Sequence, residues 1–433
     1  MGRFRASLLG STLAICLLFG TTISHAYLSD RKVHTPPRYY TFLPPREGKS
    51  YIDPVFGTRV RRVSDARRRA AESGRGIPGW ITHEYSTISP FSEDDRHLLL
   101  IHQTHFALYT GGGRYVRDLP EEIDALSQPR WSRREPDVFY YVNGSDLRKH
   151  DVSTGTSAVV HSFGEYSRIS GYGESDISQD GDHLVFVGDN RDVFVYTIST
   201  DVKGAILDTS GLGGFDQVYV TPDNNVLIGW YAVGEDRYQG VELYDREMRF
   251  IRKITRAIGH MDVTRDVDGS ESLLWVNGGD PASLCPNSIV KIRLRDGVPT
   301  CLITFDYGLA LHLSAPDDAR WFFVSTYAPD DPTPFGAWPT YTCEILQISL
   351  DGSSVRRLVH HRSRPFNDYD YQPRASSNRR GTRLVYDSNY GLQTRAGYPP
   401  DYSDVFMITR LRFPCAGRDA IPCGSPNRAT KSR

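Results

Sequence analysis

The chain has few of the residues and motifs that mark several common protein classes. It contains 4 methionines and 6 cysteines in 433 residues, and its formal net charge at pH 7 is −1. A net charge this close to zero argues against a nucleic-acid partner, because surfaces that bind phosphate backbones carry an excess of basic residues. G-x-S-x-G, H-E-x-x-H and phosphate-cradling glycine motifs are absent. Serine hydrolase, zinc metalloprotease and nucleotide-binding functions therefore have no support.

Long apolar runs are also absent, except near the N-terminus. Residues 8–19 form one such run, which Arg3 and Arg5 precede and Ser24-His25-Ala26 follows. This pattern is typical of a secretory signal peptide, and the run is too short for a membrane anchor. We therefore predict a signal peptide over residues 1–26, a periplasmic or secreted location, and no membrane span.

Five cysteines remain beyond the predicted signal peptide, and none has C-x-x-C spacing, so a structural zinc site built on cysteine is not expected. In an oxidising compartment, Cys415 and Cys423 are expected to form a disulfide that staples the C-terminal tail, residues 414–433. The spacing leaves the connectivity of Cys285, Cys301 and Cys343 open, with one thiol left over.

One sequence unit recurs along the chain, and its clearest copy is residues 259–277. The unit is a short strand entered by polar residues, a tight Asp/Gly turn and a second, apolar strand. Equivalent positions in the copies are Ser89, Ser132, Ser178, Thr221, Thr264, Ala315 and Ser377. The first five positions lie about 43–46 residues apart, which is the period of a propeller blade built from four short strands. Seven copies predict an all-β, seven-bladed β-propeller.

The blade order suggests how the ring closes. The blades are predicted at residues 82–120, 127–164, 173–207, 215–256, 259–306, 311–359 and 371–411. The last blade supplies only three strands, whereas residues 57–64 alternate like a strand that has no blade of its own. We expect this N-terminal strand to join the last blade, because closure removes two exposed sheet edges. The propeller then spans residues 51–413, after an extended, Pro- and Tyr-rich lead-in at residues 27–50.

Loop lengths indicate which face carries the function. Loops between the second and third strands of a blade lie on the same face as the starts of the inner strands, and they are long in the last three blades, at residues 277–287, 327–341 and 388–402. Long loops are usually functional or disordered. We interpret these as the wall of a substrate cleft, with a disordered rim as the alternative. The substrate-binding residues predicted in the loops are Trp338, Tyr341, Tyr390, Arg395 and Tyr398.

Polar residues at the starts of the inner strands are expected to line the mouth of the central channel. They include His83, Arg130, His260, Asp262, His312, Asp370, Gln372 and Arg374. A single polar residue there is ordinary, because the channel is wet. The residues from the last three blades gather under the three long loops, however, and such a group is the natural candidate for a site.

The recurring unit resembles the blades of Tol-type periplasmic propellers. The closing strand, with His260 and Gln372 at inner-strand starts, resembles more specifically the oligogalacturonate lyase family. That resemblance implies a seven-bladed propeller that cleaves uronate oligosaccharides by β-elimination with a divalent metal. It places His260 among the metal ligands and puts the last-blade ligand positions on Asn367, Asp370 and Gln372, where none of the family's histidines is present. Oxygen ligands of this kind suit a hard cation such as calcium or manganese.

A lyase of this kind needs three groups. Arg374, or a cation held by His260, Asp262 and Asp370, would neutralise the uronate carboxylate. His312 is the first choice for the base and His260 the second. Tyrosines from the long loops would stack on the sugar or protonate the leaving oxygen, and His83, Arg130 and Gln372 would also contact the substrate. The competing hypothesis is a non-catalytic propeller that binds a glycan or a cell-envelope protein, because fold alone does not decide function. Convergence of His260, His312 and Arg374 would favour the enzyme.

Overall fold

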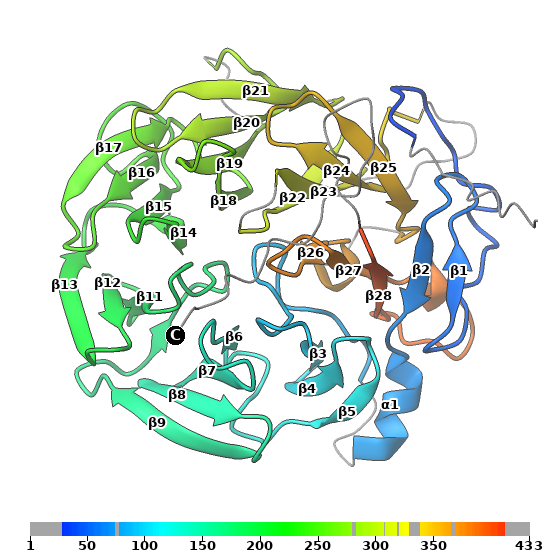
Figure 1. The fold of residues 1–433 in the computed structure, drawn as a ribbon, viewed down its shortest axis with the longest axis horizontal. Helices are drawn as coiled ribbons and strands as arrows, with labels where there is room; N and C mark the ends of the chain where they lie inside the picture. The colour runs from blue at the N-terminus through cyan, green and yellow to red at the C-terminus, as the bar shows by residue number, and fades with distance from the viewer. Residues whose placement is uncertain are drawn as a thin grey trace, which may run out of the picture.

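Seven antiparallel sheets follow one another around a ring, as Figure 1 shows. The structure is a computed structural model that describes residues 28–73, 78–278, 283–306, 308–317, 320–328, 338–364 and 369–411. The predicted all-β, seven-bladed propeller is therefore confirmed. The signal peptide, Asn367, the Cys415–Cys423 pair and the C-terminal tail lie outside the described residues.

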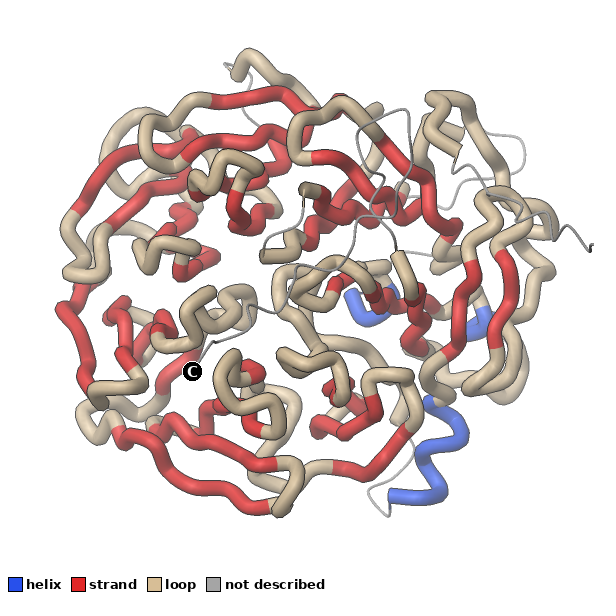
Figure 2. Tube along the Cα trace, in the orientation of Figure 1, coloured by secondary structure: helices blue, strands red, loops and turns tan. Residues whose placement is uncertain are grey.

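In the first six blades the strands run outward from the central channel in chain order (Figure 1), and strands make up most of each blade (Figure 2). In the first two blades they are β3 (His97–His102), β4 (His105–Thr110), β5 (Tyr115–Asp118), β6 (Arg130–Trp131), β7 (Val138–Asn143), β8 (Asp146–Asp151) and β9 (Thr156–Ser162). In the third and fourth they are β10 (Ile169–Ser170), β11 (His183–Gly188), β12 (Asp192–Thr197), β13 (Val202–Asp208), β14 (Phe215–Val220), β15 (Val226–Trp230), β16 (Gly240–Tyr244) and β17 (Phe250–Thr255).

The fifth and sixth blades follow the same plan, and the last sheet differs from it. The strands of blades five and six are β18 (Met261–Arg265), β19 (Glu271–Asn277), β20 (Ser288–Arg293), β21 (Pro299–Thr304), β22 (Ala310–Ser314), β23 (Trp321–Tyr327), β24 (Glu344–Ser349) and β25 (Val355–His360). The last sheet has the order β1-β2-β28-β27-β26, with bounds β1 (Ser50–Ile52), β2 (Arg59–Arg62), β26 (Ser376–Ser377), β27 (Arg383–Ser388) and β28 (Asp404–Thr409).

The recurring turn is held by the side chain at its first position. In blade three, the Ser178 hydroxyl accepts hydrogen bonds from the backbone amides of Asp182 and His183, at 3.2 and 2.8 Å. In blade seven, Asn378 Oδ1 plays the same part for the amides of Thr382 and Arg383, at 2.8 and 2.9 Å. Short polar side chains that bond to the backbone a few residues ahead stabilise such turns. In the last blade the bonds come from Asn378, one residue after the predicted equivalent position Ser377.

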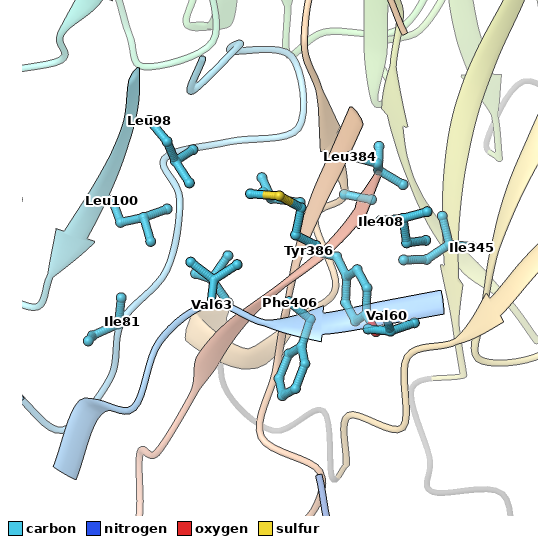
Figure 3. Close-up of a cluster of buried hydrophobic side chains, with 14 of the residues drawn as sticks. Val60, Val63, Ile81, Leu98, Leu100, Ile345, Leu384, Tyr386, Phe406 and Ile408 are labelled. Atoms are coloured by element: carbon cyan, nitrogen blue, oxygen red, sulfur yellow. The ribbon is translucent and has the colours of Figure 1, made fainter. Parts of the chain in front are cut away.

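The N-terminal strand predicted at residues 57–64 pairs with the last blade. Val60 of β2 lies opposite Ile408 of β28, and Arg62 lies opposite Phe406. Val60 and Val63 are fully buried among side chains of the first, sixth and seventh blades (Figure 3). The N-terminal segment thus supplies two outer strands of the last sheet, β2 and β1.

A buried ion pair fastens the same strand. Arg62 Nη2 donates to Asp404 Oδ2 at 2.7 Å, and the Ser64 hydroxyl and the Ala66 amide both donate to Asp404 Oδ1 at 2.9 Å. Burying a charged pair is costly unless its remaining bonding positions are filled. Here donors of the N-terminal segment bond to both oxygens of the Asp404 carboxylate, so the ion pair fixes the register of β2 against β28.

Three local features differ from the expectation. A short helix, α1 (Ala66–Ser73), follows β2. The inner strand of the first blade is reduced to isolated bridges at Thr82–Ile101 and Phe91–Leu98. In the third blade the inner strand ends at Ser170, because Tyr172 and Gly173 take positive φ angles of 55° and 76° that a regular strand does not accept.

Two of the three cysteines left open by spacing form a disulfide. Cys285, in the loop before β20, is bonded to Cys301 on β21, and Cys343 is buried and lies outside this disulfide. In the described part of the chain, no helix has both the length and the apolar character to cross a membrane.

Candidate active site at the mouth of the channel

Two predicted histidines meet at the start of the inner strands of blades five and six. The rings of His260 and His312 are stacked, with centroids 4.4 Å apart. His312 Nε2 lies 3.1 Å from Gln372 Oε1, which also accepts the hydroxyl of Tyr327 at 3.1 Å. The structure therefore brings together His260, His312 and Gln372, three of the residues predicted from inner-strand positions.

The hydrogen-bond acceptors around the rings of His260 and His312 indicate which nitrogen of each ring carries a proton. The Leu311 carbonyl can only accept, so His260 donates to it through Nδ1–H, and Nε2 keeps its lone pair. Gln372 Oε1 likewise accepts from His312 Nε2–H, which leaves the lone pair on a buried Nδ1 that has no hydrogen-bond partner. Burial lowers the pKa of both imidazoles, and for His312 the neighbouring His260 lowers it further. Both rings are neutral at pH 7.

The two histidines differ in access. His312 is only 1% exposed, whereas His260 is half-buried at the mouth. A general base must reach the proton it removes. His260 is therefore the more accessible of the two predicted bases.

A row of aromatic rings continues from His312 across the mouth. Tyr85 meets the edge of His312 at 5.7 Å, and Tyr369 lies nearly parallel to Tyr85 at 6.5 Å. Tyr369 is 48% exposed, and its ring covers Arg374, whose guanidinium carbon lies 4.2 Å from the centre of the ring. Exposed tyrosine faces of this kind are a common platform for apolar and amphipathic ligands.

Arg374 lies beneath this platform and is buried. Its Nη2 donates to Asp387 Oδ2 at 3.2 Å, and its Nη1 donates to the Glu84 carbonyl at 3.4 Å. His83 is fully buried beside it, with Nδ1 2.9 Å from Asp387 Oδ1. Arg374 and His83 therefore build the floor of the mouth and do not reach a ligand directly.

Arg130 occupies a similar structural position. It forms a two-oxygen ion pair through Nη1 with Glu84, at 2.8 and 2.9 Å, and Nε donates to the Ser175 carbonyl at 2.6 Å. Burial raises the pKa of Glu84, although Arg130 opposes the shift. Like Arg374, Arg130 is buried and paired, so its charge is balanced inside the protein.

A polar cavity of about 50 Å³ lies further along the channel, lined by Glu174, Tyr219, Asp262 and the turn residues of several blades. Burial raises the pKa of Glu174 to about 7, helped by Asp216, while a hydrogen bond from Tyr219 at 2.5 Å opposes the shift. Asp262 accepts the amides of Val263 and Ala315 at 2.8 and 2.7 Å, and burial raises its pKa well above the ordinary value.

Three of the predicted cation ligands, His260, Asp262 and Asp370, can be compared with one another. Both Asp262 oxygens bond to backbone in the channel wall, and Asp370 lies near enough to Arg374 to raise the pKa of that guanidinium. Across the described residues, His260, Asp262 and Asp370 do not bring ligand atoms together as a group of three. The predicted cation site also includes Gln372 and Asn367, which lies outside the described residues, so it stays a prediction.

Most of the predicted loop residues are also away from the mouth. Tyr390 is buried, with its hydroxyl 2.7 Å from that of Tyr51 and its ring 4.5 Å from Phe406. Trp338 is buried against Tyr39, and Tyr341 against Phe305. Their apolar surface is used in the core, so they do not form the cleft wall that their loop positions suggested.

The last two loop residues are Arg395 and Tyr398, of which Tyr398 lies near the N-terminal segment. Arg395 is exposed, and Tyr398 is half-buried under the guanidinium of Arg67, 4.3 Å from the ring centre. Tyr327 and Tyr369, which do reach the mouth, were not among the residues predicted to bind substrate. Their signal was their position, since Tyr327 ends the strand after His312 and Tyr369 precedes Gln372.

The fold and this mouth define a seven-bladed propeller with a histidine- and tyrosine-lined site at one end of its channel. Among solved structures, the chain is similar to an oligogalacturonate lyase in complex with manganese, with 13% sequence identity, a TM-score of 0.57, and coverage of 84% of this chain and 96% of that one. It is also similar to oligogalacturonate lyase from Vibrio parahaemolyticus, with 15% identity, a TM-score of 0.57, and coverage of 83% and 96%. No protein-family model and no curated protein matches the sequence. The resemblance to oligogalacturonate lyases thus holds, at the level of the fold.

Proposed function

We propose that this protein binds an acidic oligosaccharide over the mouth of the channel and cleaves it by β-elimination next to a uronate. The observation that carries the proposal is the neutral, half-buried His260, whose Nε2 lone pair is not used by the Leu311 contact. The exposed ring of Tyr369, which is linked to His260 through the rings of His312 and Tyr85, offers a surface on which a sugar can stack. The likeness of the fold to oligogalacturonate lyases supports the substrate class.

The proposed reaction needs two proton transfers, one from the sugar carbon to a base and one from an acid to the leaving oxygen. His260 Nε2 takes the proton on the carbon next to the carboxylate, the carbon–oxygen bond to the leaving sugar breaks, and a carbon–carbon double bond forms. The leaving oxygen takes a proton from the Tyr369 hydroxyl or from water. Burial raises the pKa of Tyr369, so its hydroxyl is protonated at neutral pH and can donate. Proton transfers by a positioned side chain typically accelerate a reaction by about 10²–10⁴-fold.

In this proposal His312 and Arg374 do not touch the sugar but hold in place the residues that do. His312 stacks on His260 and holds Gln372, and Arg374 supports the ring of Tyr369 from below. The Gln372 amide and the Tyr369 hydroxyl are the groups placed to meet the sugar. We also propose that the protein works outside the cytoplasm, which the Cys285–Cys301 disulfide supports.

A second function is favoured by one specific observation. Arg374, the cation expected to neutralise the uronate carboxylate, is buried and engaged by Asp387. Because the Arg374 guanidinium is already paired, the channel mouth also suits a propeller that binds an oligosaccharide without cleaving it. The two functions share the ligand class and differ in whether His260 matters for turnover or only for contact.

The test is the ultraviolet absorbance of the unsaturated uronate product. Purified protein is incubated with oligosaccharides of galacturonate, glucuronate and mannuronate, each with calcium, with manganese and with chelator. We expect a rise on one uronate, lost in His260→Ala. His161→Ala is the matched control, because His161 lies on the outer strand β9 away from the channel, and it should keep full activity.

Binding measurements separate the two candidate functions. A flat absorbance trace with retained binding of an acidic oligosaccharide, measured by calorimetry, would support the non-catalytic binder. Tyr369→Ala should weaken binding, while Tyr369→Phe should retain it because the stacking face is kept. Full activity in His260→Ala would refute the assignment of the base.

A further inference from the structure

We propose that the first blade carries a site for a zinc-type divalent cation, formed by His102, His105 and Asp118. Across the described residues, these three bring one ligand atom each to within 4.8 Å of one another. His102 ends β3, His105 begins β4 and Asp118 ends β5. The site lies on strands outside the channel wall and involves none of the residues at the mouth.

The sheet register explains why the three side chains meet. His102 lies directly opposite His105 across a two-residue turn, and Asp118 lies opposite Ala107. Opposed residues point to the same face of a sheet, and so do residues two apart on one strand. All three side chains therefore project from one face of blade one, at the end where β3 and β5 stop.

The distances suit a cation shared by the three groups. His102 Nδ1 and His105 Nε2 lie 3.7 and 3.3 Å from Asp118 Oδ1. The edge of a tetrahedron around zinc, with bonds of about 2.0–2.1 Å, is roughly 3.3 Å. His105 Nε2 is buried and has no hydrogen-bond partner, although the carboxylate is close. A buried nitrogen in that state is costly unless something fills the space in front of it.

Each of the three groups is also oriented by a neighbour. His102 Nε2 lies 2.8 Å from the Tyr109 hydroxyl, so its Nδ1 is turned toward Asp118. His105 Nδ1 lies 3.2 Å from Thr104 Oγ1, which turns Nε2 the same way, and the Tyr115 hydroxyl donates to Asp118 Oδ1 at 3.0 Å. Metal ligands are typically fixed by such outer hydrogen bonds. Two imidazoles and one carboxylate favour zinc and similar transition metals over calcium or magnesium.

The chain contains a matched control on the same blade. His97 Nε2 lies 2.8 Å from Asp137 Oδ1, so it forms a histidine–aspartate pair at the other end of β3. That pair has no third His, Cys, Asp or Glu ligand in the part of the chain that the structure describes. A variant at His97 removes a similar pair without touching the proposed site.

The experiment titrates zinc alone into protein first treated with chelator, by calorimetry, and measures Tm with and without zinc. We expect one zinc ion per chain and a rise in Tm. Asp118→Asn and His105→Gln should weaken binding by at least about tenfold, and His97→Gln should leave it unchanged. Absence of binding to the unaltered protein, or equal binding by Asp118→Asn, would overturn the proposal.

A spectroscopic measurement keeps the test decisive if a variant does not fold. Cobalt added to the unaltered protein should give the strong visible bands of a low-coordinate ion held by nitrogen and oxygen, and one equivalent of zinc should remove them. A spectrum that stays that of hydrated cobalt would refute the site. Because the titration contains no sugar, its outcome is independent of whether the channel mouth is an active site.

Discussion

Removing two buried methyl pairs from the N-terminal strand should destabilise the whole protein. Val60 and Val63 are 0% exposed and pack among three blades (Figure 3). Each Val→Ala change deletes two methyl groups, and the lost burial plus the remaining cavity costs about 2–3 kcal/mol. The double variant should then lose about 4–6 kcal/mol, a large part of the 5–15 kcal/mol that typically stabilises a folded domain.

The assay is urea unfolding followed by tryptophan fluorescence and circular dichroism. Val159→Ala is the matched control, because Val159 lies on β9, an outer strand, and is 49% exposed. It should change the free energy of unfolding by about 0.5 kcal/mol or less. If Val60→Ala/Val63→Ala unfolded at the same urea concentration as Val159→Ala, the N-terminal strand would not be part of the cooperative core, and the reasoning would be refuted.

Other parts of the fold give further expectations. Deleting residues 51–64 should prevent folding instead of producing a trimmed propeller, which the absence of a cooperative urea transition would show, whereas a stable truncated form would contradict the role of β2. Replacing Cys301 with serine should cost about 2–3 kcal/mol, because the disulfide closes a loop across 16 residues, and a urea midpoint that does not move would contradict this. Burial lowers the pKa of His361 to about 3, so between that value and about 6.5 the unfolded chain binds a proton that the folded protein does not; stability should fall as the pH falls, by up to about 1.4 kcal/mol per pH unit. His361→Asn should show a shallower loss between about pH 6 and pH 4, and an equally steep loss would count against that cause.

The architecture could be predicted because each blade is marked by a pattern of residues that are close together in the sequence. The Ser or Thr at the start of most of these turns, as at Ser178, recurs with the blade, and the apolar strand that follows it is local. The convergence of His260, His312 and Gln372 followed from the same register, since equivalent positions in neighbouring blades meet at the channel.

The remaining features depend on contacts between distant residues. Tyr390 looked like a cleft residue from its loop, yet its surface is taken by Tyr51 and Phe406, which lie far away in the sequence. The pairing of Arg374 with Asp387 likewise appears only once the strand register is known. His102 and His105 carried a weak signal, two histidines across a tight turn, but Asp118 joins them only through the pairing of β5 with β4.

The pairing of β2 with β28 also has a consequence for how the chain is made. Arg62 and Asp404 are 342 positions apart, so β2 has no partner until the last blade has been synthesised. Until then its apolar side chains have no place to be buried, and contacts of such long range are slow to form. Closure of the propeller ring should therefore come only after the last blade has been synthesised, and until then the unpaired N-terminal segment is where a chaperone would have most reason to bind.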